Sequence, residues 1–212
     1  MNTTTKFFKR AVLFTIPLFL LLSFQCNKND TRPCIFNSYS FAVTSEWSPQ
    51  KETYNVGDTI FLSSTFPKTL PDLVNPSLTI DYSNSTGIGG AIGIAAPDSL
   101  QRTNKPAKDS FQFVSIIGSF SERTGNKNIS INFIESSSSY QFKGGIICKK
   151  KGLFGISVDN LRSRGIRGKN CTNAGFNMNV TNSNKYILPY QNALGIILDA
   201  ESLKKIYCFR VQ

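Results

Sequence analysis

Apolar and polar residues alternate over short stretches along most of the chain, which is the pattern of half-buried β-strands. In NISINFI (residues 128–134) apolar side chains recur at every second position, and FQFVSII (111–117) is rich in aromatic and β-branched residues. The same features predict strands at residues 38–44, 58–66, 77–83, 111–117, 128–134, 140–148, 153–159, 175–181 and 205–211. Clusters of Gly, Pro, Asn, Asp and Ser separate these runs at about the spacing of a β-sandwich.

Helical periodicity is scarce, and the best helix signal is Asp199, which can cap a turn through AESLKK. No repeat of roughly 20 to 50 residues is present, so a propeller or solenoid is not expected. The glycine run TGIGGAIGIAAP (86–97) does not match G-x-G-x-x-G, and it favours a loop or a closely packed strand over a phosphate-binding loop. We therefore expect an all-β protein with a single antiparallel β-sandwich over residues 34–212.

The run YNVGDTIFL (54–62) resembles the turn and strand that open many secreted immunoglobulin-like domains. Gly57 can adopt a positive φ, and the Asp58 side chain can bond to nearby backbone before the strand begins. KKKGLFGISVDN (149–160) is similar, with Gly152 at the corner. The resemblance implies an immunoglobulin-like sandwich, a fold that serves many functions and therefore implies no particular activity.

The first 25 residues have the layout of a signal peptide. Lys6, Lys9 and Arg10 form a positive segment, and the apolar run that follows, AVLFTIPLFLLL (11–22), is 12 residues long. A membrane-spanning helix needs about 20 apolar residues, so this run fits a cleaved export signal better than a permanent anchor.

The segment LLLSFQCNKND resembles the lipobox and polar tether of a bacterial lipoprotein of the Bacteroidetes type. The resemblance implies lipidation of Cys26 after removal of residues 1–25, a flexible tether over residues 26–33, and attachment to the bacterial outer membrane, facing the periplasm or the surface. Gln25 departs from the pattern, because the family usually has Gly, Ala or Ser before the cysteine. Lys28 and Asp30 echo the charged residues that follow the cysteine in surface-displayed members.

Four cysteines remain after Cys26, an even number in a chain expected to reach an oxidising compartment: Cys34, Cys148, Cys171 and Cys208. They allow three pairings. We favour Cys34 with Cys208, because the first and last strands of a sandwich often lie side by side, and this choice leaves Cys148 with Cys171. Free buried thiols are the alternative.

The absence of histidine excludes Ser-His-Asp and Cys-His catalysis and any zinc site that needs imidazole. Asp199 and Glu201 are the closest pair of acids, and Ser202 with Lys205 matches S-x-x-K without its companion motifs. Both features are expected by chance in a chain of this composition. The D-x-D-x-D spacing of calcium loops is also absent, so no metal or cofactor is expected.

Removal of residues 1–25 leaves 21 basic against 13 acidic residues, a net charge of +8 on 187 residues. One group of basic residues could attract acidic glycans or an acidic envelope protein, if two loops bring its members together: Lys149, Lys150, Lys151, Arg162, Arg164, Arg167 and Lys169. Scattered solvated charge is the alternative interpretation. Nucleic acid is not an expected partner of an exported chain.

These observations favour a non-catalytic lipoprotein of the cell envelope that serves as a binding or structural module. A glycan-active enzyme using paired carboxylates is one alternative, and it requires acids that converge in a cleft. A subunit of a surface assembly is another, and it requires an exposed apolar strand edge.

Overall fold

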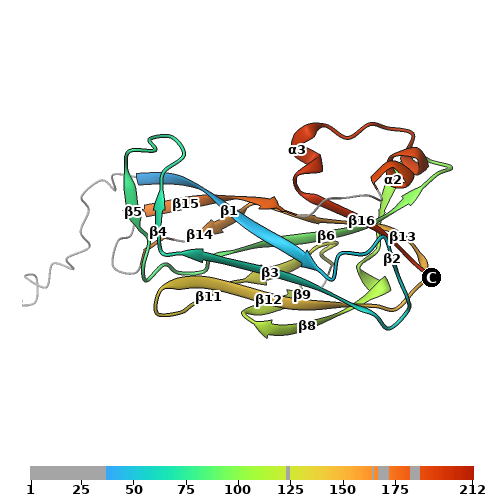
Figure 1. The fold of residues 1–212 in the computed structure, drawn as a ribbon, viewed down its shortest axis with the longest axis horizontal. Coiled ribbons are helices and arrows are strands. Elements are labelled where there is room, and N and C mark those ends of the chain that lie inside the picture. The colour runs from blue at the N-terminus through green and yellow to red at the C-terminus, as the bar shows by residue number, and fades with distance from the viewer. Residues whose placement is uncertain (1–36, 123–124, 164, 167–171, 182–186) are drawn as a thin grey trace, which may run out of the picture. The chain divides into compact units, whose positions relative to one another are not determined.

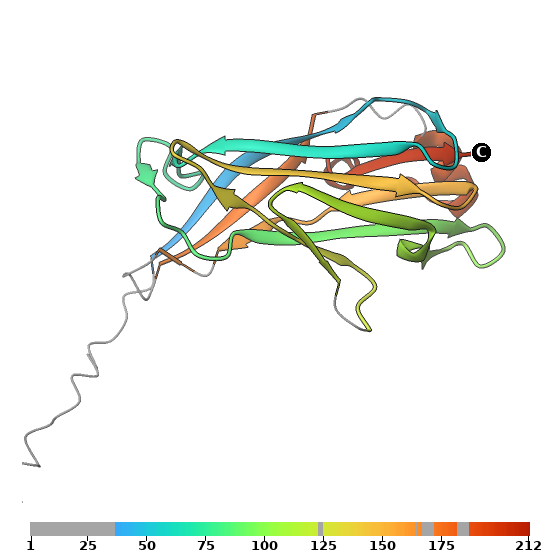
Figure 2. The same ribbon diagram turned by 90° about the horizontal axis from the view of Figure 1, so that it is seen from below.

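The computed structural model describes residues 37–122, 125–163, 165–166, 172–181 and 187–212. Cys26 and Cys34 lie outside these ranges, as do the proposed signal peptide and tether. Strands dominate, as the alternation of apolar residues predicts, and they form two layers with the core between them (Figures 1 and 2). No helix in the described part of the chain is long and apolar enough to span a membrane.

The first layer contains the C-terminal end of β1, followed by β3, β12 and then β8 and β11, which lie end to end along the outer side of β12. In β3 buried and more exposed residues alternate, so one face meets the core. The bounds are β1 Asn37–Ser48, β3 Thr59–Pro67, β8 Phe111–Ile117, β11 Ile134–Glu135 and β12 Ser139–Cys148.

The second layer is built around β6, which pairs with β13, β14, β7 and β10. β15 and β16 pair with β14 and β13, and β9 pairs with β10. The bounds are β2 Thr53–Tyr54, β6 Gly89–Asp98, β7 Thr103–Pro106, β9 Ser119–Glu122, β10 Ile129–Asn132, β13 Gly152–Val158, β14 Leu161–Ser163, β15 Thr172–Val180 and β16 Ile206–Val211.

β1 joins the two layers. Residues 37–45 pair in parallel with β15, and residues 46–48 then pair antiparallel with β3. β16 and β2 form a second parallel pair. The expectation of a purely antiparallel sandwich is therefore wrong, although the all-β class and the two packed layers are confirmed.

Smaller elements complete the fold. The hairpin β4 (Thr69–Pro71) and β5 (Thr79–Asp81) is fastened to β1, where buried Asp72 accepts a hydrogen bond from the Ser40 N–H at 2.9 Å. The helical elements within the described ranges are the short 3-10 turn at Lys108–Ser110, α2 (Ile187–Leu194) and α3 (Ala200–Leu203). Asp199 caps α3 as predicted, accepting from the Ser202 N–H at 2.7 Å, whereas α2 has no counterpart in the sequence-based prediction.

The core is aromatic. The Phe176 ring lies 5.2 Å from that of Phe41 and 5.3 Å from that of Phe66, centroid to centroid, and Phe111 packs edge-on against Phe154 at 4.9 Å. Trp47 of β1 stacks on Tyr207 of β16 with ring centroids 6.0 Å apart. Ring pairs of this geometry stabilise the packing between the layers by more than the burial of apolar area alone.

Candidate functional site

The acidic residues considered for catalysis do not form a catalytic pair. Asp199 serves as the cap of α3, and its hydrogen bonds with Ser202 hold the pKa of its carboxyl below the usual value. Glu201 forms a surface ion pair with Lys204 at 2.7 Å. Among the described residues no three Cys, Asp or Glu side chains cluster as metal ligands would.

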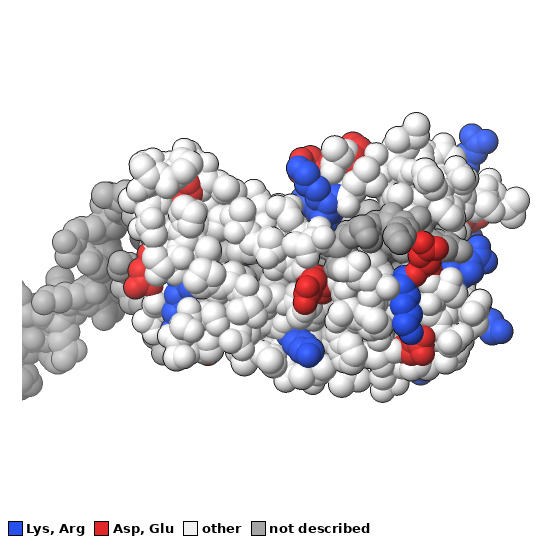
Figure 3. Space-filling model, in the orientation of Figure 1, with Lys and Arg blue, Asp and Glu red and all other residues white. Residues whose placement is uncertain are grey.

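Other acids are paired singly with lysines at separate places, Glu135 with Lys68 at 2.7 Å and Asp98 with Lys105 at 2.5 Å. Figure 3 shows acidic and basic side chains spread over one face of the molecule without a cluster of one sign. The convergence of carboxylates that a glycosidase needs is therefore missing from the described residues.

The structure separates the described members of the predicted basic group. Lys149, Lys150 and Lys151 are exposed in the turn between β12 and β13, and Arg162 is exposed on β14. The chain from Gly152 to Arg162 is mostly extended, which places the two sites roughly 30 Å apart at about 3.3 Å per residue. They do not form one patch. Arg164, Arg167 and Lys169 lie outside the described residues.

Cys148 and Cys208 are buried on different sides of the second layer. Cys148 belongs to the main core, whereas Cys208 packs with Tyr190 and Leu194 under α2. Burial raises the pKa of the Cys148 thiol to about 11, so it is protonated and a poor nucleophile at neutral pH. The partners predicted for them, Cys171 and Cys34, lie outside the described residues, and both pairings stay predictions.

Small hollows open on the described surface, and two of them are lined by strand residues. The first, of about 230 Å³, lies where β1 leaves β15 for β3, and buried Ser45 Oγ has no hydrogen-bond partner among the described residues. The second, of about 280 Å³, lies between β6, β13 and α2, where the Tyr190 hydroxyl donates to Asn104 Oδ1 at 2.6 Å. Neither brings together a nucleophile and a base. The first is lined by Thr44, Ser45, Glu46, Ser63, Ser64, Thr65 and Thr181.

The most distinctive surface feature is the open edge of β8. Within the described part of the chain β8 pairs with β12 and with no other strand. Its sequence, FQFVSII, contains no charge and no proline, and Val114 and Ile116 are 40% and 50% exposed. Natural proteins usually guard exposed edges with charges, prolines or bulges. On β8 the guard is one bulge near its end, where Ser115 pairs with Gly144 and Ile117 pairs with Lys143.

The hydrogen-bond pattern shows which backbone groups of β8 face outward. Cys148 exchanges hydrogen bonds with the β3 side, because its N–H donates to the Asp58 oxygen at 2.9 Å and its oxygen accepts from the Gly57 N–H at 2.7 Å. Alternate residues of an antiparallel strand face opposite neighbours. Gly145 therefore bonds to its partner Val114 on β8. It follows that Phe113 and Ser115 direct their N–H and C=O groups away from β12, toward the open edge.

The turn after β8 keeps this edge open. At Gly118 (φ 76°) the chain turns, and β9 forms its backbone ladder with β10 and none with β8, although the Phe120 N–H donates to Ser115 Oγ at 2.9 Å. Figure 2 shows the β9–β10 hairpin projecting from the layers. Phe120 then packs on the inner side against Phe113 and Phe142, at centroid distances of 5.4 and 5.2 Å.

Two other strands in the described residues carry guards of this kind. β7 includes Lys105 and Pro106, and β9 ends with Glu122. The pattern of residues 111–117 predicts the strand correctly, yet its place at an edge depends on the later turn at Gly118. The sequence signal that could have revealed it is the run of seven uncharged residues containing exposed β-branched positions.

Comparisons with known proteins add little. No protein family matches the sequence, and no curated protein matches it either. Among solved structures the chain is similar to the second type II cohesin module of the adaptor ScaA scaffoldin of Acetivibrio cellulolyticus, with 10% identity, a TM-score of 0.29, and coverage of 63% of this chain and 92% of that one. The type II cohesin dyad of the same scaffoldin gives 9% identity, a TM-score of 0.31, and coverage of 67% and 47%. These scores are too low to transfer a fold or a function.

Proposed function

We propose that this protein is a non-catalytic binding module of the cell envelope that adds a strand of a partner protein to the open edge of β8. The observation that supports the proposal is the uncharged, partly apolar edge itself, with the outward-facing backbone groups of Phe113 and Ser115. A subunit of a surface assembly would also need an exposed strand edge. The edge of β8 therefore fits a binding module and an assembly subunit equally.

Strand addition gives affinity through backbone hydrogen bonds and specificity through alternate side chains. Val114 and Ile116 are both exposed, and Ile116 is the extra residue of the bulge between Ser115 and Ile117. A partner strand with apolar residues would cover both. The dispersal of the acids and the absence of histidine favour binding over catalysis.

The proposed anchor fits this geometry. Lipid on Cys26 would fix the chain to the membrane, and the domain begins at Asn37 of β1. Gly144 of β12 pairs with Leu62 of β3, which pairs with Trp47, ten residues along β1 from Asn37. Cys148, which pairs with Phe111 at the start of β8, lies four residues further along β12, so this end is roughly 45 Å from Asn37 at about 3.3 Å per residue.

The test uses a fluorescent peptide of alternating threonine and valine, which tends to form strands, and measures binding by anisotropy. Saturable binding is expected for the mature protein, and Ile116→Lys should weaken it at least about tenfold because a charge then lies beside the pairing strand. Ile197→Lys is the matched control, since Ile197 is 93% exposed on the loop before α3. Equal loss in both variants, or no binding by the parent, would contradict the proposal.

A further inference from the structure

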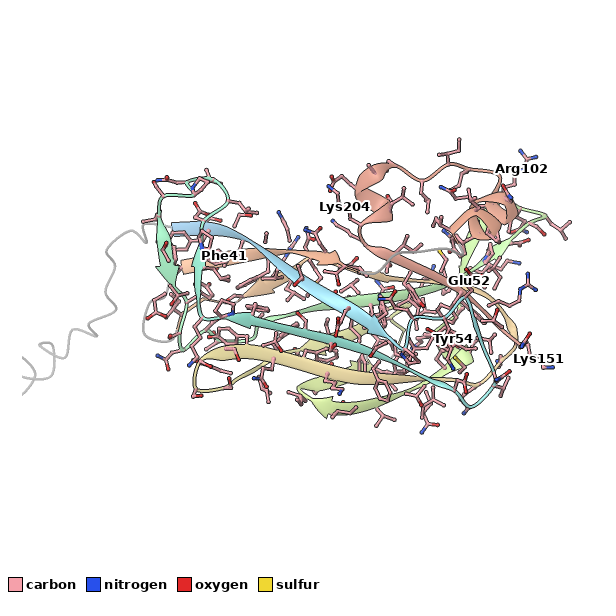
Figure 4. All side chains as sticks on the ribbon, in the orientation of Figure 1. Phe41, Glu52, Tyr54, Arg102, Lys151 and Lys204 are labelled. Carbon is pink, nitrogen blue, oxygen red and sulfur yellow. The ribbon has the colours of Figure 1, made fainter. Side chains whose placement is uncertain are left out.

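Three lysines stand at the beginning of β8. The Lys149 N–H donates to the Ser110 oxygen at 2.9 Å, directly before the pairing of Cys148 with Phe111. Lys150 and Lys151 follow in the same turn, and all three side chains are exposed. Figure 4 shows Lys151 at the end of the molecule opposite Phe41.

Few acids oppose this charge. Within the described part of the chain none of the three lysines forms an ion pair. Asp58 is paired with Lys51 at 3.6 Å, and Glu122 is paired with Lys108 at 3.5 Å. Asp109, one residue before Ser110, is the remaining acid in the segment that leads into β8. Three positive charges against one leave the entrance to β8 basic.

The far end of β8 differs. Ile117 lies opposite the single lysine Lys143, whose ammonium lies over the Phe61 ring at 5.8 Å. A segment lying along β8 would thus meet three lysines at the start of β8 and one at its end. This difference in charge between the two ends of β8 favours one orientation of a bound strand.

We infer that the partner segment is an extended strand that runs antiparallel to β8 and carries acidic residues directly after its apolar run, where they meet Lys149–Lys151. The inference rests on the proposed function of β8. Antiparallel pairing is the slightly more stable arrangement, and it places the C-terminal end of the partner beside Phe111. Exposed charges of opposite sign speed association and select orientation.

A second copy of this chain fits the edge less well. Each copy has a net charge of +8 after removal of residues 1–25, so two copies repel at long range. Its β8 contains no acidic residue to place beside the lysines. An acidic partner is not repelled by the basic protein, and it supplies acidic residues to place beside the lysines.

Three peptides with one alternating threonine and valine core test the inference, ending in three glutamates, beginning with three glutamates, or ending in three glutamines. The glutamate-ending peptide should bind the mature protein about tenfold more tightly than the glutamine peptide at low salt, because exposed ion pairs each contribute modestly. High salt should remove this advantage.

The combined variant Lys149→Gln, Lys150→Gln and Lys151→Gln should lose the tenfold advantage and still bind the glutamine peptide. The matched control is Lys204→Gln with Lys205→Gln, because Lys204 lies on a separate part of the surface (Figure 4). This control should keep the advantage.

The outcomes separate the two claims. Equal binding of all three peptides to parent and variant would overturn the acidic partner and leave strand pairing intact. Tighter binding of the glutamate-first peptide would overturn the antiparallel direction. Failure of every peptide to bind would overturn the proposed function itself.

Discussion

Asn37 of β1 and Thr172 of β15 are paired at the start of a parallel ladder. Cys34 precedes Asn37 by three residues and Cys171 directly precedes Thr172. A disulfide requires Cα atoms within about 7 Å. From these short sequence separations we predict a bond between Cys34 and Cys171.

The pairings favoured by the sequence stay predictions, and the register of the described strands places Cys148 and Cys208 away from Asn37 and Thr172. Tyr207, adjacent to Cys208, stacks on Trp47, ten residues or about 33 Å along β1 from Asn37. Cys148 lies beyond the level of Trp47 on β12, and so is equally far from Thr172. In addition, β1 pairs with β15 and β3, whereas β16 pairs with β13 and β2, so the first and last strands are not ladder neighbours.

We predict one disulfide, Cys34 with Cys171, and a reduced thiol at Cys148. Non-reducing peptide mapping of protein from an oxidising compartment should show this bond. Cys34→Ser should release Cys171 for alkylation in unfolded protein, whereas Cys148→Ser, the control, should leave the bond intact. A peptide linking Cys34 to Cys208 would show that the register argument fails.

Gly144→Ala should destabilise the domain by about 1 to 3 kcal/mol, because overpacking forces neighbouring groups to shift. An added β-carbon would overlap the Phe120 ring and lie 3.0 Å from the Phe142 ring. Gly175→Ala on β15 is the control, since nothing lies within 4 Å of its β-carbon position. Urea unfolding measures both. Similar stability of the two variants would contradict the packing of Phe120 over β12.

Alkaline pH should unfold the protein progressively. Burial raises the pKa of Cys148 from 9.0 to about 11 and that of Tyr140 from 10.0 to about 12, and it raises the pKa values of Tyr54, Tyr82 and Tyr190 as well. The unfolded chain loses these protons at lower pH than the folded protein. Stability is therefore full below about pH 9 and falls as the pH rises toward 12.

The measurement is the free energy of unfolding in urea at pH 8, 10 and 11. Above pH 10 the free energy of unfolding of Tyr140→Phe should fall less steeply with pH, because one group with a raised pKa is removed. The substitution also removes a hydroxyl that donates to the Tyr82 oxygen at 2.8 Å. Constant stability from pH 8 to 11 would mean that these groups are solvated in solution.

Cys26→Ser should abolish lipid attachment, because only a thiol accepts the lipid. The precursor should then fail to incorporate labelled palmitate in a bacterial host and should partition into the aqueous phase. Cys34→Ser, the nearest other cysteine, should label like the parent. Equal labelling of the Cys26 variant would remove the proposed anchor.

The sequence predicts individual strands better than their arrangement. Residues 111–117 match β8 in both bounds because aromatic and β-branched residues mark the strand. For residues 86–97, which include most of β6, the sequence does not decide between a loop and a closely packed strand, because small residues lack that signal. They are small because neighbours approach closely: a β-carbon at Gly90 would meet the Leu161 side chain at 2.8 Å.

Arrangement depends on contacts between distant segments. The parallel pairing of β1 with β15 joins residues more than 130 positions apart, which local alternation cannot encode. The described members of the basic group do not meet, because the extended chain between Lys151 and Arg162 separates Lys149–Lys151 from Arg162. The open edge of β8 likewise depends on the turn at Gly118, which the strand pattern does not contain.

Amide hydrogen exchange at Phe113 and Ser115 tests the central proposal most directly. It is measured by NMR on the mature protein with and without the glutamate-ending peptide. Strand addition predicts that both amides, which face the open edge, exchange at least about tenfold more slowly when the peptide is bound, because their N–H groups then pair with the new strand. Val114, already bonded to β12, should change less. Bound peptide with unchanged exchange at Phe113 and Ser115, and new protection elsewhere, would contradict the account.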